Sequence, residues 1–70
     1  MEMTWRDKSL AAIHIKFTRC RAESPQRTVS DIMKEIKPLA YKVFGNTHPT
    51  KIWRKACDDY ERDAKKMYEL

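Results

Sequence analysis

Cysteines and long apolar runs are scarce in this chain of 70 residues. Cys20 and Cys57 are its only cysteines, which excludes the dense pairing that staples small secreted domains and predicts reduced thiols. No apolar run approaches the roughly 18 residues that a membrane span requires. The N-terminus, MEMTWRDKSL, carries charges where a signal peptide has its apolar core. We therefore expect a cytoplasmic protein that is not exported and does not enter a membrane.

Patterns that carry catalysis or metal binding are also missing. The serines lie in cap or loop settings, without the histidine signature that would activate a nucleophile. The two histidines and two cysteines lack the two-to-four-residue spacing of structural zinc sites. There is no glycine-rich phosphate loop either. We expect a protein that is not an enzyme and has no catalytic residue, no metal and no cofactor.

One glycine and three prolines divide the chain into three segments that favour helix. The first runs from about Thr4 to Ala22, and Thr4 is positioned to cap it with Asp7 at the third helical position. Three- and four-residue spacing then places an apolar set on one face. This set is Leu10, Ile13, Phe17 and Cys20.

The second segment is predicted to begin at Ser30 as N-cap, with Asp31 in the first turn, where the helix dipole favours an acidic residue. Pro38 is expected to end or kink this helix, which leaves one bent helix or two short ones. Gly45 is placed to close the segment in a left-handed conformation.

The third segment is predicted to run nearly to the C-terminus, capped by Thr47 or Thr50 with Pro49 in its first turn. Its expected apolar stripe comprises Ile52, Trp53, Ala56, Tyr60, Ala64 and Met67. The three segments together predict an all-α fold in which residues 1–70 form one small domain of three to four helices.

An alternative pattern occurs inside the first segment, because Ile13, Ile15 and Phe17 alternate with polar residues as in a half-buried strand. A short strand near residues 13–18 followed by two helices resembles the ribbon-helix-helix repressors. That resemblance implies a dimer whose two-stranded ribbon enters the DNA major groove. The outward-facing readers would be His14, Lys16 and Thr18.

A helix-turn-helix-like arrangement is the preferred interpretation, because the stretch from Leu39 to Arg54 combines a packed helix, Gly45 at a turn, and a basic helix start. The net charge of +5 also favours a polyanionic partner. We expect a small regulator of the phage, plasmid or bacterial-accessory type that binds duplex DNA as a dimer. The acidic stretch at residues 58–63 confines the expected contact to the first two turns of the third helix. The candidate DNA-binding residues are Thr47, His48, Thr50, Lys51, Arg54 and Lys55, with Lys16, Arg19, Arg21 and Arg27 on backbone phosphates.

A second class of function is a protein-binding inhibitor or adaptor that uses a helical face of mixed charge. Trp5 and Tyr68, near the two termini, are its expected interface residues, whereas Trp53 and Tyr60 are expected in the core. The two classes differ in one structural property, which is whether the basic residues of the first and third segments converge on one surface.

Overall fold

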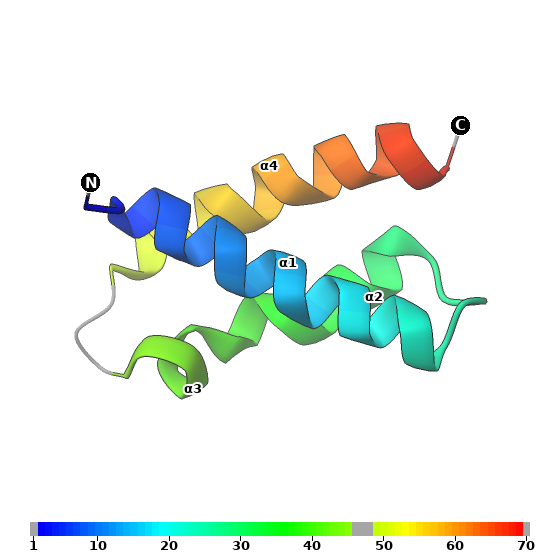
Figure 1. Ribbon diagram of the computed structural model, residues 1–70, viewed down its shortest axis with the longest axis horizontal. Helices are drawn as coiled ribbons and strands as arrows, with labels where there is room; N and C mark the ends of the chain where they lie inside the picture. The colour runs from blue at the N-terminus through cyan, green and yellow to red at the C-terminus, as the bar shows by residue number, and fades with distance from the viewer. Residues whose placement is uncertain (1, 46–48, 70) are drawn as a thin grey trace.

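The computed structural model describes residues 2–45 and 49–69, and every regular element in these ranges is helical. Figure 1 shows α1 and α4 running in the same direction, while the segment from α2 to α3 returns the other way. The all-α prediction is therefore confirmed. The elements are α1 (Trp5–Glu23), α2 (Val29–Ile36), the 3-10 helix η1 (Lys37–Leu39), α3 (Ala40–Phe44) and α4 (Thr50–Tyr68).

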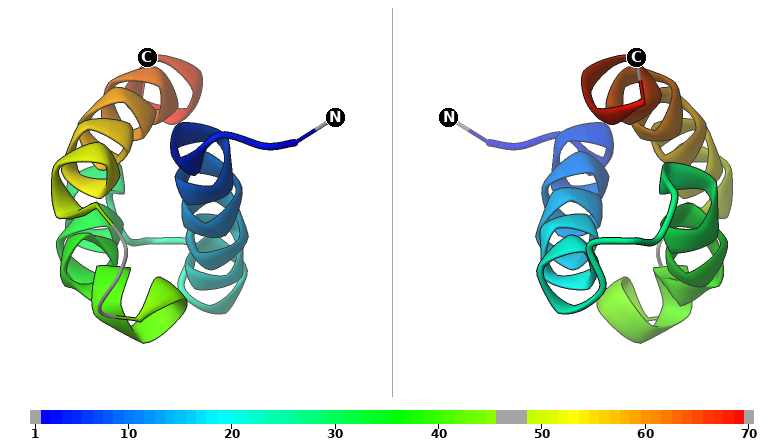
Figure 2. Two further views of the ribbon diagram at one scale, coloured as in Figure 1. Left: turned by 90° about the vertical axis from the view of Figure 1, so that its left-hand side faces the viewer. Right: turned by 90° about the vertical axis from the view of Figure 1, so that its right-hand side faces the viewer.

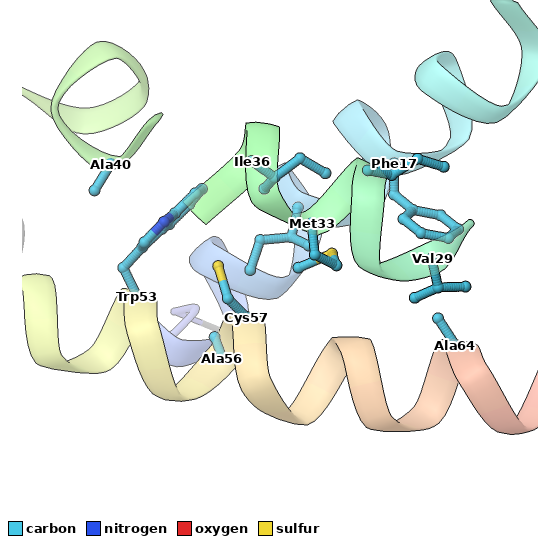
Figure 3. Close-up of a cluster of buried hydrophobic side chains, with 11 residues drawn as sticks. Phe17, Val29, Met33, Ile36, Ala40, Trp53, Ala56, Cys57 and Ala64 are labelled. Carbon is cyan, nitrogen blue, oxygen red and sulfur yellow. The ribbon is translucent and has the colours of Figure 1, made fainter. Parts of the chain in front are cut away.

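A single core lies where the three helical segments meet (Figures 2 and 3). Aromatic rings join α1 to α4, since Phe17 lies 5.3 Å from Tyr60 and 5.8 Å from Tyr68 between ring centroids. The Trp53 Nε1 donates a hydrogen bond to the Lys37 carbonyl at 2.8 Å and so fixes η1 against α4. The buried side chains are Ile13, Phe17, Val29, Ile32, Met33, Ile36, Ala40, Trp53, Ala56, Cys57 and Ala64.

Residues 13–18 lie within α1, so the strand alternative and the ribbon-helix-helix resemblance are wrong. Ile13 and Phe17 are fully buried whereas Ile15 is 59% exposed, which is what a period of 3.6 residues requires and a period of two does not. The Thr18 hydroxyl donates to the His14 carbonyl at 3.0 Å, a bond within one helix. At the start of α1, Thr4 accepts from the Asp7 amide at 3.1 Å, as predicted.

The cap of α2 is Thr28, not Ser30. The Thr28 Oγ1 accepts a hydrogen bond from the Asp31 amide at 3.1 Å, and the helix begins at Val29, so Ser30 already lies in the first turn. Glu69 supplies a second acceptor, since its Oε1 accepts a hydrogen bond from the Val29 amide at 2.7 Å. The end of α4 therefore satisfies an N-terminal amide of α2, a contact that no local pattern predicts.

A Thr28→Ala variant is expected to lose about 1 kcal/mol of unfolding free energy, because an N-cap oxygen is removed from an otherwise unpaired amide. Ser30→Ala is the matched control and should change stability by less than about 0.5 kcal/mol. Urea denaturation followed by circular dichroism measures both values. Equal losses in the two variants would contradict the assignment of Thr28 as the cap.

Pro38 and Gly45 shape the returning segment. Pro38 lies in η1, which joins α2 to α3. The segment therefore forms two short α-helices, the second of the two forms expected. Gly45 has a φ of 80°, as expected for a closing glycine, but its ψ of −169° is outside the left-handed helical region. Its amide donates to the Tyr41 carbonyl at 2.9 Å and ends α3.

The start of α4 differs from the prediction. Pro49 is the N-cap and Thr50 is the first helical residue, so Thr50 does not cap the helix; Thr47 lies outside the described residues. The Pro49 carbonyl accepts from the amides of Ile52 and Trp53 at 3.1 and 3.2 Å, which closes the first turn without a side chain. Within residues 2–45 and 49–69, no helix has the length and apolarity needed to cross a membrane.

The predicted apolar stripe of α4 is mostly confirmed. Trp53, Ala56 and Ala64 are buried, and Tyr60 is partly buried against the core, but Met67 in the last turn is 70% exposed. A hydrogen bond joins Tyr60 to α1, because the Tyr60 hydroxyl is 2.7 Å from the His14 Nδ1. Burial raises the pKa of that phenol, and Tyr68 adds to the effect.

Candidate functional site

The basic residues of the first and third segments that were predicted to bind DNA do not converge on one surface. Figure 1 shows that α1 and α4 both start at one end of the domain and finish at the other, along a longest dimension of 34 Å. The basic residues at the start of α4 are therefore far from those at the end of α1. Of the ten candidates, Thr50, Lys51, Arg54 and Lys55 lie at one end, Arg19, Arg21 and Arg27 at the other, and Lys16 between them on α1. Thr47 and His48 lie outside the described residues.

Two of the arginines at the far end have structural partners. The Arg21 guanidinium lies 3.9 Å from the centroid of the Tyr68 ring, a cation–π contact that ties the ends of α1 and α4 together. Arg27 pairs with Glu35 at 2.8 Å and donates to the Asp31 carbonyl at 3.1 Å. The hydrogen bond that Arg27 donates to the Glu35 carboxylate is the main cause of the raised pKa of Arg27. These contacts indicate that both side chains support the fold.

A hollow at the other end brings together basic and hydroxyl side chains from three elements, η1, α3 and α4. The hollow has a volume of about 140 Å³. One side is formed by η1 and the start of α3, and the other by the first two turns of α4. Buried Ala40 and Trp53 also line it. We call its exposed and half-buried lining the basic notch: Lys37, Pro38, Tyr41, Thr50 and Arg54.

The local sequence explains why the notch forms. Pro38 lacks an amide hydrogen and so replaces a regular α-helical turn with η1, which places Lys37 toward α4. The hydrogen bond from Trp53 to the Lys37 carbonyl then holds the two elements together. Tyr41 is 58% exposed at the rim. Lys51 follows Thr50 on the exposed surface and is a neighbour of Arg54 at three-residue spacing.

The start of α4 adds positive charge to the notch. The first turn of α4 contains no acidic residue and no side-chain cap among the described groups, so its partial positive charge is uncompensated there. In the described part of the chain, Lys51 and Arg54 form no ion pair. Lys37 is paired: its Nζ lies 3.4 Å from Glu61 and 3.7 Å from Asp58, and Asp58 also lines a neighbouring hollow with Arg54.

The acidic stretch of α4 is less continuous in space than in sequence. Asp59 is 18% exposed and pairs with Arg6 at 2.8 Å, and Glu61 is 22% exposed and pairs with Lys37 at 3.4 Å. Both carboxylates therefore turn toward neighbouring helices. Asp58 and Asp63 remain exposed on the outer side. The sequence could not show this division, because it depends on where α1 and η1 lie.

Lys55 belongs to a different surface from Arg54. Lys55 lines a groove with Trp5 on the α1 side of α4, whereas Arg54 faces η1. Trp5 and Tyr68 are 38% and 42% exposed, but they do not form one patch. The Trp5 ring lies 5.8 Å from the Phe44 ring between centroids, near the start of α1. The Tyr68 ring lies at the other end of α1, where it contacts Arg21.

Lys37 and Tyr41, the two polar residues of the notch outside α4, were not among the predicted site residues. The sequence does contain a sign of them: Lys37 and Tyr41 are four residues apart, which places both on one helical face, outside the apolar face of the second segment. No group of three or more metal-binding side chains occurs among the residues that the structure describes. Comparison with known family models, curated proteins and solved structures finds no match to this chain.

Proposed function

We propose that this protein is a small regulator of the phage, plasmid or bacterial-accessory type that binds duplex DNA by holding backbone phosphates in the basic notch. The observation that carries the proposal is the meeting of Lys37 and Arg54, from separate elements, at one hollow with the hydroxyls of Tyr41 and Thr50. Lysine, arginine and hydroxyl donors are the groups that most often contact phosphate oxygens. Lys51, exposed beside them, adds a third cation.

The position of the notch defines how a duplex would approach. The start of a helix favours anions, because its amides and dipole present positive charge. Contact through the first two turns of α4, with η1 and α3 alongside, is the docking that a helix-turn-helix arrangement implies. Under this proposal Arg19, Arg21 and Arg27 are not DNA contacts. Dimerisation stays a prediction.

A double variant with Lys51→Ala and Arg54→Ala is expected to bind DNA more weakly. Its affinity should also depend less on salt concentration. Each phosphate contact contributes about −0.9 to the slope of log affinity against log salt concentration, so the double variant should flatten the slope by about one to two units. Fluorescence anisotropy with a labelled random-sequence duplex at several salt concentrations measures this slope.

The matched control is Arg19→Ala combined with Lys66→Ala, which removes the same charge from exposed positions away from the notch. This control should keep most of the wild-type slope. An equal flattening in both double variants would show that net charge, and not the notch, determines binding. No binding by the wild-type protein at low salt would contradict the proposed function altogether.

A further inference from the structure

A second surface lies on the opposite flank of α4. A groove of about 440 Å³ separates the start of α1 from the first three turns of α4. Trp5 and Ile52 supply its apolar surface, and Met3, immediately before α1, is also 50% exposed. We call this the Trp5 groove, lined by Thr4, Trp5, Arg6, Ile52, Lys55 and Asp59.

The rim of the Trp5 groove is cationic. Lys55 is exposed, and the Lys8 Nζ lies 4.8 Å from the centroid of the Trp5 ring. Arg6, with 48% of its side chain exposed, binds Asp59 at 2.8 Å. The hydrogen bond from Arg6 is the main cause of the lowered pKa of Asp59, so this acid is charged and already neutralised. The remaining charge around the apolar surface is therefore positive.

We propose that the Trp5 groove binds an acidic peptide segment of a partner protein, in which a leucine or phenylalanine anchor is flanked by aspartate or glutamate. The anchor would enter the apolar space between Trp5 and Ile52, and the flanking carboxylates would meet Lys8 and Lys55. An exposed tryptophan beside a pocket and a rim of one charge are typical of peptide-binding hot spots. The charge complementarity selects an acidic occupant and disfavours a basic one.

The same features argue against DNA as the occupant of this groove. Thr4, Arg6 and Lys55 also line it, but most of its accessible wall is apolar and it contains Asp59, whereas the accessible wall of the basic notch is mainly polar, as a phosphate-binding surface requires. Arg54 and Lys55 are adjacent in sequence but lie on the two flanks of α4. One helix thus separates two binding surfaces, and the protein can hold an acidic partner while it binds DNA.

The test uses a fluorescein-labelled peptide of sequence EEDLFEDE, titrated with the full chain and followed by anisotropy. We expect saturable binding that Lys55→Glu weakens by about tenfold or more, because an attractive contact becomes repulsive. Trp5→Ala should weaken it to a similar extent through loss of the apolar wall. Lys66→Glu is the matched control: it makes the same charge change at an exposed position near the other end of α4, away from the groove, and should weaken binding less than about threefold.

Two peptide controls define the contrary results. A peptide with lysine at every acidic position should not bind, and neither should an acidic peptide with serine replacing leucine and phenylalanine. Equal binding of either peptide, or equal effects of Lys55→Glu and Lys66→Glu, would overturn the inference. So would self-association that Trp5→Ala abolishes, since a second copy would then be the occupant. Peptide binding that persists when the notch is mutated would support this inference even if DNA binding fails.

Discussion

A Trp53→Ala variant is expected to lose about 3–5 kcal/mol of unfolding free energy, one of the largest effects expected of a single truncation in this protein. Trp53 is 1% exposed, contacts Phe44 at 5.9 Å between ring centroids, and donates to the Lys37 carbonyl. A domain of this length has a total stability of roughly 3.5–10 kcal/mol, so the loss consumes a large part of it. Urea denaturation and near-ultraviolet circular dichroism measure the change.

Two further variants separate the causes of this loss. Trp53→Phe keeps most of the apolar volume but leaves the Lys37 carbonyl without its donor, which should cost about 1–3 kcal/mol. Trp5→Ala removes the same side chain type from a position that is 38% exposed and should cost clearly less than Trp53→Ala. If the two tryptophan-to-alanine variants were equally stable, the assignment of Trp53 to the core would be wrong.

Stability is expected to fall as pH rises through the alkaline range because of Cys57. This thiol is fully buried, and burial raises its pKa from 9.0 to about 11. Above pH 9.0 the unfolded chain loses the thiol proton while the folded chain retains it, so the unfolded state gains relative stability until about pH 11. By about pH 10.5 this effect should reach about 2 kcal/mol. Tyr60, whose pKa is also raised by burial, acts in the same direction.

The measurement is the free energy of unfolding in urea at about pH 8 and about pH 10.5 for the wild type, Cys57→Ala and Cys20→Ala. Cys57→Ala should be less stable at the lower pH, since a buried side chain is truncated, but should show a shallower decline. Cys20→Ala keeps the Cys57 thiol and should decline as steeply as the wild type. Parallel declines in wild type and Cys57→Ala would contradict the linkage.

The parts of the fold that the sequence predicted correctly are those fixed by local spacing. Thr4 caps α1 with Asp7 three residues away, and Ile13 and Phe17 share a buried face because four residues complete about one turn. The cap of α2 was misplaced, since Thr28 and Ser30 are both suitable residues and only the path of the entering chain selects one. The contact from Glu69 to Val29 spans 40 residues and has no local signal.

The candidate site was predicted only in part for the same reason. Thr50, Lys51 and Arg54 follow from the start of a basic helix, but Lys37 joins them through a hydrogen bond between residues 16 apart. The separation of Arg54 from Lys55 requires knowing which flank of α4 faces α1. Whether basic residues of α1 reach the same surface depends on the parallel arrangement of α1 and α4, which a single sequence does not show.

The most direct test of the central claim is a titration of ¹⁵N-labelled protein with duplex DNA, followed by amide chemical shifts. We expect the largest shifts at Lys37, Tyr41, Thr50, Lys51 and Arg54. The amides of Arg19, Arg21 and Arg27 should change little. Large shifts at the far end of α1, with the basic notch unaffected, would contradict the claim that the notch is the phosphate-binding surface.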